Sequence, residues 1–253
     1  TMVPITYSYE SSIKLDKNTP IFLYAYGGYN ISIRPAFTPK YVAWLEMGGV
    51  LAVANIRGGG EFGKAWHNAG RLDTKQNVFD DFLYASKFLE NNSIGNRKST
   101  VISGRSNGGL LVGTTLVQNP NYFGAALPAV GVMDMIRFTE FTEGWGWRGD
   151  YGSPILNQTD FQRNIKISPY HQTKIDVCYS PTLTTTGRRD DRVVPSHSYK
   201  FTARLQEYQG CTNPVMLYDA TRAGHGSGNG VAMPKWKRIE LFSIEQSFAL
   251  KNI

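Results

Sequence analysis

One pentapeptide, Gly104-Arg105-Ser106-Asn107-Gly108, constrains the fold of this 253-residue chain more than any other feature. It has the pattern G-x-S-x-G, it follows the apolar pair Val101-Ile102, and it precedes a helix-like segment from Leu110 to Val117. A serine on a sharp strand-to-helix turn is exposed at the edge of a sheet, and the flanking glycines let neighbouring backbone pass without a Cβ clash. The pattern therefore predicts a strand–turn–helix unit that presents Ser106 as a nucleophile.

A serine nucleophile needs a base and an acid that orients the base, and on such a unit they follow in the order Ser, Asp or Glu, His. The β-prone run Pro181–Gly187 is followed by Asp190 and Asp191, and the run Val215–Tyr218 is followed by His225. The carboxyl ends of parallel strands share one edge of a sheet, where ligands bind. The order and the positions fit, although spacing alone does not separate Asp190 from Asp191.

The chain has four histidines, and three of them fit the role of base less well. His67 lies in a glycine-rich segment, His171 is expected in a loop, and His197 is expected early in a helix that starts near Pro195. Only His225 comes after the acid and stands beside glycines at a strand end. His225 is therefore the candidate base.

Alternating strand and helix patterns predict the α/β class, with a mostly parallel central sheet and helices on both faces. The runs 21–25 and 50–54 are continuously apolar, as expected for strands buried on both faces. Apolar residues from Val78 to Leu89 recur at helical spacing and predict a crossover helix. Further elements are expected at 3–9 and 125–130 as strands, and at 195–209 and 234–250 as helices. The length suits a single domain over residues 1–253.

Five segments closely resemble the catalytic domain of the prolyl oligopeptidase family, namely 24–33, 48–63, 106–111, 190–195 and 223–226. The resemblance implies an α/β-hydrolase fold and a serine peptidase that cleaves on the carboxyl side of proline through an acyl-enzyme, without a cofactor. The family's full enzymes also carry a β-propeller, and no repeated short strands of that kind occur here. With its start at Thr1, the chain is expected to be a domain of a longer protein, whose propeller would be its partner, or a short relative.

The resemblance also assigns roles to individual positions. It implies Ser106 as nucleophile, His225 as base, and Asp190 rather than Asp191 as the acid. The oxyanion donors would be the backbone N–H of Asn107 and the hydroxyl of Tyr26. Trp147 would stack on the substrate proline, Arg192 would hydrogen-bond a substrate carbonyl, and the other pocket walls would be Tyr29, Tyr151 and Val193. Without the family match, Trp147 would be interpreted as a core aromatic.

Two residues depart from the family pattern. Arg105 replaces the glycine usual before the nucleophile, and a long cation there either crowds the site or adds a favourable charge for anionic substrates. Tyr29 replaces a phenylalanine and adds a hydroxyl to the pocket wall. Two alternatives to the peptidase stay open: a carboxylesterase that uses the same triad, and a catalytically silent scaffold that binds peptides.

Other function classes are disfavoured. The segment 58–63 fits G-x-G-x-x-G, but Asp80 is expected inside a helix instead of at a strand end, which argues against dinucleotide binding. The net charge is +7, but the lysine and arginine residues are scattered along the chain, so no nucleic-acid surface is expected. The dispersed histidines and two cysteines predict no metal site, and the cysteines are expected to be reduced in a cytoplasmic protein. No apolar run approaches the length of a membrane span.

Overall fold

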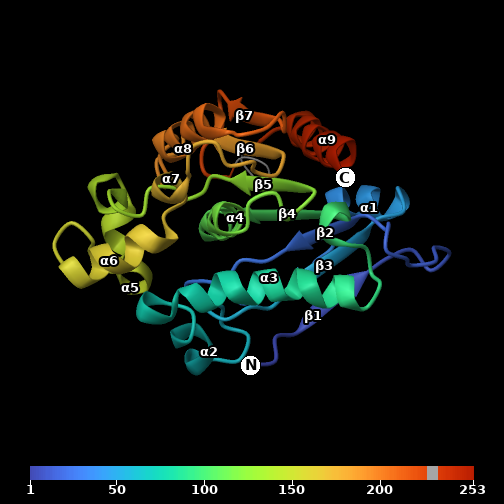
Figure 1. Cartoon of the computed structure of the whole chain (residues 1–253), viewed down its shortest axis with the longest axis horizontal. Helices are drawn as coiled ribbons and strands as arrows, with labels where there is room; N and C mark the ends of the chain where they lie inside the picture. The colour runs from blue at the N-terminus through green and yellow to red at the C-terminus, as the bar shows by residue number, and fades with distance from the viewer. Residues whose placement is uncertain (227–232) are drawn as a thin grey trace.

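The computed structural model describes residues 1–226 and 233–253, which build one sheet covered by helices (Figure 1). The strands are β1 (Ile5–Ser8), β2 (Ile21–Tyr24), β3 (Val50–Ala54), β4 (Thr100–Arg105), β5 (Ala125–Ala129), β6 (Thr182–Gly187) and β7 (Val215–Ala220). The helices are α1 (Pro39–Glu46), α2 (Lys64–Asn68), α3 (Gln76–Asn91), α4 (Asn107–Gln118), α5 (Arg148–Tyr151), α6 (Gln158–Ile167), α7 (Pro169–Gln172), α8 (Ser196–Tyr208) and α9 (Lys235–Asn252). Short 3₁₀ helices cover Leu72–Thr74, Arg97–Ser99, Phe138–Glu140 and Gly144–Trp147.

The sheet is mostly parallel, as predicted. Its strand order is β1-β3-β2-β4-β5-β6-β7, and only the edge strand β1 runs antiparallel to its neighbour β3. This order places β4 in the middle of the described sheet. The residues that follow β2, β4, β6 and β7 therefore emerge at the same edge.

Strand β2 shows why both faces of the sheet need helices. Ile21 and Leu23 belong to the large core cluster on the side of α3 and α4, whereas Phe22 packs with Trp44 of α1 and Phe248 of α9. Successive side chains of a strand point to opposite faces, so an uninterrupted apolar run buries two surfaces. Figure 1 shows α3 beside α4, away from the pair α1 and α9. The prediction of helices on both faces is confirmed.

Several element boundaries differ from those expected from the sequence. Helix α4 begins at Asn107, directly after the nucleophile candidate, three residues before the apolar segment suggested. His171 lies in the single turn α7 instead of a loop, and Pro195 and Pro234 immediately precede their helices. Asp80 lies within α3, as expected, and the glycines of 58–63 shape a loop in which Gly58 accepts a hydrogen bond from Asn30 N at 3.3 Å.

The expectation of reduced thiols is wrong, because Cys178 and Cys211 form a disulfide with their Cα atoms 5.1 Å apart. Their segments precede β6 and β7, which are neighbours in the sheet. Val177 and Gln209 form a parallel bridge there, and Gly210 N donates to Val177 O. Sequence spacing of 33 residues gives no sign of this proximity, which the pairing of the strands creates.

Within the described part of the chain, none of the helices combines the length and apolarity needed to cross a membrane. The same residues contain no cluster of three or more histidine, cysteine, aspartate and glutamate side chains able to hold a metal ion.

Candidate active site

Ser106 occupies a strained turn between β4 and α4. Its backbone has φ 57° and ψ −118°, a conformation that residues other than glycine rarely adopt. Ser106 N donates to Ala129 O at 2.9 Å, which ties the turn to the end of β5. This strained turn between a strand and a helix is the geometry expected of a nucleophile elbow, and the Ser106 side chain is half-buried.

The first glycine of the pentapeptide is required by a close backbone contact. A Cβ on Gly104 would lie 2.2 Å from the carbonyl oxygen of Gly108, far inside the van der Waals distance. That carbonyl belongs to the first turn of α4, so it cannot move without shifting the helix. The sequence pattern thus reflects the close approach of the strand to the helix that follows the serine.

The candidate acid and base are paired. His225 Nδ1 lies 2.8 Å from Asp190 Oδ2, and the aspartate side chain is fully buried whereas that of the histidine is one-fifth exposed. The other carboxylate oxygen, Oδ1, accepts hydrogen bonds from Arg192 N at 3.1 Å and Val193 N at 2.9 Å. Asp191 is exposed, so the structure separates the two acids that spacing leaves equivalent.

Tyr26 and Asn107 come together beside Ser106. Burial raises the pKa of Tyr26 to about 12, opposed by a hydrogen bond with the side chain of Ser106. The phenol therefore keeps its proton, and its ability to donate, well above neutral pH. Asn107 is the first residue of α4, where backbone N–H groups have no partner within the helix. Both groups can donate to an oxyanion formed at Ser106.

A pocket of about 330 Å³ opens beside the serine. Every residue that the family resemblance assigns to substrate binding lines it, together with three of the five residues expected to do the chemistry. Its lining is Tyr26, Tyr29, Ile31, Ser106, Asn107, Val132, Glu143, Gly146, Trp147, Tyr151, Arg192 and Val193. Ile31, Val132, Glu143 and Gly146 were not predicted, because nothing in their local sequence signals a pocket.

Aromatic side chains dominate one part of the pocket. Trp147 is partly exposed and stacks on Phe138 with ring centroids 6.3 Å apart and planes at 9°, so it combines core packing with a free face toward the pocket. Tyr29 and Tyr151 meet edge to face at 5.6 Å. The additional hydroxyl of Tyr29 is satisfied by a hydrogen bond with the hydroxyl of Tyr151, and burial raises the pKa of Tyr29.

Arg105 neither crowds this pocket nor contributes to its lining. Its side chain turns to the other side of the elbow, where Nη2 donates to the backbone oxygen of His225 at 3.0 Å. Burial lowers the pKa of Arg105, and the nearby carboxylate of Glu245 in α9 opposes that shift. The departure from the family glycine therefore connects the nucleophile turn to the histidine loop.

Two buried charged residues near the pocket were missed by sequence reasoning. Lys75, just before α3, donates from Nζ to Gly27 O at 3.0 Å and to Asn107 Oδ1 at 3.1 Å. Asp150 in α5 accepts from Tyr29 N at 2.9 Å and lies 3.0 Å from His67 Nε2. A lysine or aspartate at a helix end normally suggests a solvated side chain, so no local signal reveals these contacts.

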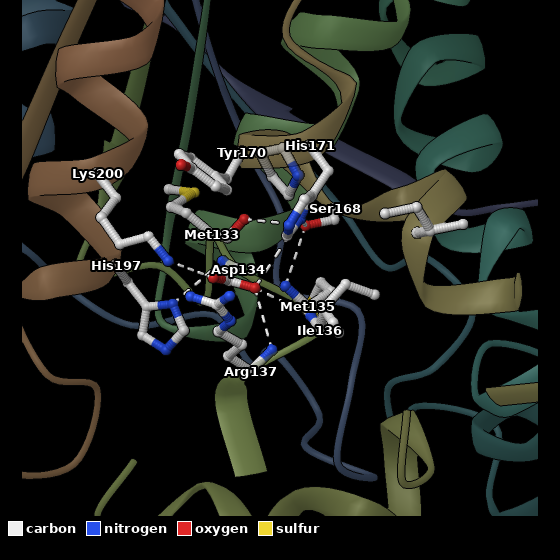
Figure 2. Close-up of polar contacts among 12 residues, drawn as sticks. Met133, Asp134, Met135, Ile136, Arg137, Ser168, Tyr170, His171, His197 and Lys200 are labelled. Carbon is white, nitrogen blue, oxygen red and sulfur yellow. Dashed lines mark hydrogen bonds and ion pairs between the residues drawn. The ribbon is translucent and has the colours of Figure 1, made fainter. Parts of the chain in front are cut away.

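His171 and His197 belong to a separate polar cluster around Asp134, shown in Figure 2. Ser168 Oγ lies 2.8 Å from His171 Nδ1, and Asp134 Oδ1 lies 3.9 Å from the same nitrogen. A catalytic triad uses opposite ring nitrogens for the serine and the acid, so this arrangement is not a second triad. Asp134 also forms an ion pair with Lys200, and its backbone N donates to His197 Nδ1 at 3.1 Å. The cluster joins the segment that follows β5 to α7 and α8.

Comparison with known proteins shows the family of this chain. The model of the prolyl oligopeptidase family matches residues 35–251. A prolyl endopeptidase of Elizabethkingia meningoseptica is 44% identical over 244 residues, which are 96% of this chain and 35% of that protein. Prolyl oligopeptidase A of Amanita bisporigera is 38% identical over 256 residues, which cover 100% of this chain and 33% of that protein.

Solved structures show the same likeness. A prolyl endopeptidase structure superposes with a TM-score of 0.91 at 42% identity, covering 100% of this chain and 35% of that one. Prolyl oligopeptidase B from Galerina marginata, bound to a 35mer hydrolysis and macrocyclization substrate, gives a TM-score of 0.93 at 36% identity with the same coverage. The chain thus spans about a third of the length of the relatives it matches. It has the α/β-hydrolase fold and belongs to the prolyl oligopeptidase family.

Proposed function

We propose that the protein is a serine peptidase that cleaves peptides on the carboxyl side of proline. The observation that carries the proposal is the position of Ser106 in the wall of the same pocket as Trp147 and Arg192, with the His225–Asp190 pair at the neighbouring strand ends. Relatives that align with 96% and 100% of the chain are named prolyl endopeptidases, which supports the same activity.

The proposed chemistry is acyl transfer. Ser106 Oγ attacks the carbonyl carbon of the proline residue, and its proton passes to His225 while Asp190 holds the ring through Nδ1. The carbonyl oxygen becomes an oxyanion that accepts from Asn107 N–H and Tyr26 Oη. The C–N bond then breaks, the amine leaves with the proton from His225, and an ester on Ser106 remains. Water hydrolyses that ester by the same proton transfers in reverse.

The pocket supports the choice of proline. A proline ring is flat and apolar, and an indole face such as that of Trp147 removes it from water over a large area. Tyr29, Tyr151 and Val193 provide the other walls, and all of these residues line one cavity. Arg192 is exposed at its mouth, where its guanidinium can donate to a carbonyl of the acyl-side peptide.

We propose residues 1–253 as a single α/β-hydrolase domain. A proline-containing peptide is its substrate, and a β-propeller, which the family resemblance implies for the full enzymes, is its natural partner. The cytoplasmic location expected from reduced thiols loses that support, because the cysteines are paired and disulfides persist mainly in oxidising compartments.

The test compares hydrolysis of a succinyl-Gly-Pro chromogenic amide and a p-nitrophenyl acyl ester by the wild type and by Ser106→Ala. We expect the wild type to cleave the amide and the variant to lose roughly 10⁶-fold in turnover if the triad acts as a unit. Turnover of the ester alone would leave the triad intact but remove Trp147 and Arg192 from a role in proline selection. A wild type that hydrolyses neither the amide nor the ester would overturn the proposal.

A further inference from the structure

Lys75 is a buried cation placed where it is costly. The residue is only 2% exposed, and no carboxylate of residues 1–226 or 233–253 lies within ion-pair distance of its ammonium group. It also directly precedes α3, at the end where the helix dipole disfavours positive charge. Buried lysines without a charged partner are rare, because removing an ammonium ion from water is unfavourable. Such a local conflict is typical of a residue retained for function.

Lys75 is one of three hydrogen-bond partners that hold the side chain of Asn107. The amide oxygen of Asn107 accepts from Lys75 Nζ at 3.1 Å and from Tyr151 Oη at 2.7 Å, and its Nδ2 donates to Tyr26 O at 2.5 Å. Nothing larger than glycine fits at position 28, because a Cβ there would lie 2.6 Å from Asn107 Nδ2. The Asn107 side chain is therefore held on all sides.

The ammonium group joins the two segments that carry the proposed oxyanion donors. One segment is the first turn of α4, which provides Asn107 N–H, and the other is the loop after β2, which provides Tyr26 Oη. Lys75 bonds the first through Asn107 Oδ1 and the second through Gly27 O at 3.0 Å. Lys75 itself does not line the pocket. Any effect it has on the reaction must pass through these two segments or through its charge.

We propose that Lys75 is a positioning residue for the oxyanion hole. Its ammonium group fixes the Asn107 and Tyr26 donors relative to each other, and its positive charge behind Asn107 favours the oxyanion over the neutral carbonyl. Donors held in place before the reaction need no reorganisation when charge develops, which makes them effective in a water-poor site. This inference rests on the proposed hydrolase function.

The proposal has a signature in pH. Burial lowers the pKa of Lys75 to about 8, and the carboxylate of Asp150 partly opposes this shift. The other titratable groups around it are Tyr151, whose ring centroid lies 5.4 Å from Nζ, Tyr26, and His67 on Asp150. Above about pH 8 Lys75 loses its charge, so turnover should fall. The fold should gain stability over the same range, because the unfolded chain still binds that proton up to about pH 10.4.

The experiment measures kcat and KM from pH 6 to 10 for the wild type, Lys75→Met and Lys98→Met, with urea unfolding at each pH. Lys98 contacts Asn121 at the far end of β4 and is the matched control. We expect Lys75→Met to lower kcat at pH 7 by about 10- to 100-fold, below the loss of a direct donor, with KM changed less than about threefold. The alkaline fall in turnover near pH 8 should disappear.

The following results would contradict the positioning role of Lys75. An unchanged kcat and alkaline limb in a folded Lys75→Met overturns the inference. If Lys75→Met does not fold, the pH dependence of the wild type is the test. The inference predicts that turnover falls while stability rises above about pH 8, so a change of both in the same direction overturns it. Fluorophosphonate labelling of Ser106 is measured in parallel. Unlabelled wild type overturns the proposed function and the inference together, whereas labelled wild type beside an unaffected Lys75→Met overturns only the inference.

Discussion

Replacement of Arg105 by methionine should impair turnover without changing substrate binding. The methionine keeps an unbranched side chain of similar girth but removes the guanidinium that donates to His225 O at 3.0 Å. Because Arg105 does not line the pocket, KM should stay nearly constant. The loop that carries His225 would lose its connection to the nucleophile turn, so the base would spend less time in reach of Ser106.

The magnitude follows from the kind of contact that is lost. A hydrogen bond with one charged partner contributes about 1.5–3 kcal/mol, and about 1.4 kcal/mol corresponds to a tenfold change. We therefore expect kcat on the proline amide to fall about 10- to 100-fold. The rate of fluorophosphonate labelling should fall in parallel, because that reaction needs the same base.

Stability must be separated from positioning in this experiment. Glu245 is buried at 7% exposure and loses a nearby cation when Arg105 is replaced. Urea unfolding of Arg105→Met therefore measures its loss of stability separately from its loss of turnover. Arg97→Met, in the 3₁₀ helix Arg97–Ser99 that precedes β4, is the control for loss of an exposed arginine. Equal kcat in the wild type and a folded Arg105→Met would refute the reasoning.

Three further outcomes are expected. Tyr26→Phe should lower kcat about 10²- to 10³-fold, as for loss of one oxyanion donor, and an amide assay that shows less than a threefold loss would contradict this role. Replacing Cys178 and Cys211 by serine should cost about 3–4 kcal/mol in urea unfolding, from the 33-residue loop they close, and equal stability would argue against the disulfide. Burial lowers the pKa of His197 from about 6.5 in the unfolded chain to about 4 in the folded protein. The free energy of unfolding should therefore fall by up to about 3 kcal/mol as the pH decreases from about 6.5 toward 4. His197→Gln should flatten that loss, and an unchanged pH dependence would assign it to other groups.

The elements of the fold could be predicted because their signals are local. Continuous apolar runs at Ile21–Tyr24 and Val50–Ala54 indicate strands buried on both faces, and the periodic spacing in α3 indicates a helix with one buried side. The glycines around Ser106 record a close approach between adjacent segments. Helix starts were less accurate, because α4 begins with Asn107 and two glycines, whose conformation is set by the elbow and not by helix preference.

The candidate site, like the fold, could be predicted from the sequence only in part. The order of Ser106, the acidic pair and His225 along the chain indicated a hydrolase, and family resemblance was needed to choose Asp190. Tertiary structure gives the physical basis of that choice, because Asp190 is buried against two backbone N–H groups and His225 while Asp191 is exposed.

The sequence by itself determined the α/β class and the strand–turn–helix around Ser106, because each depends on neighbours within a few positions. Its resemblance to a known family supplied the candidate oxyanion and pocket residues. Only the tertiary structure decided that Lys75 lies under Asn107, that Arg105 reaches the histidine loop, and that Cys178 meets Cys211. Lysine, arginine and cysteine are each compatible with a solvated surface position. Their contacts join segments 32, 120 and 33 residues apart, and strand pairing and helix packing alone bring such segments together.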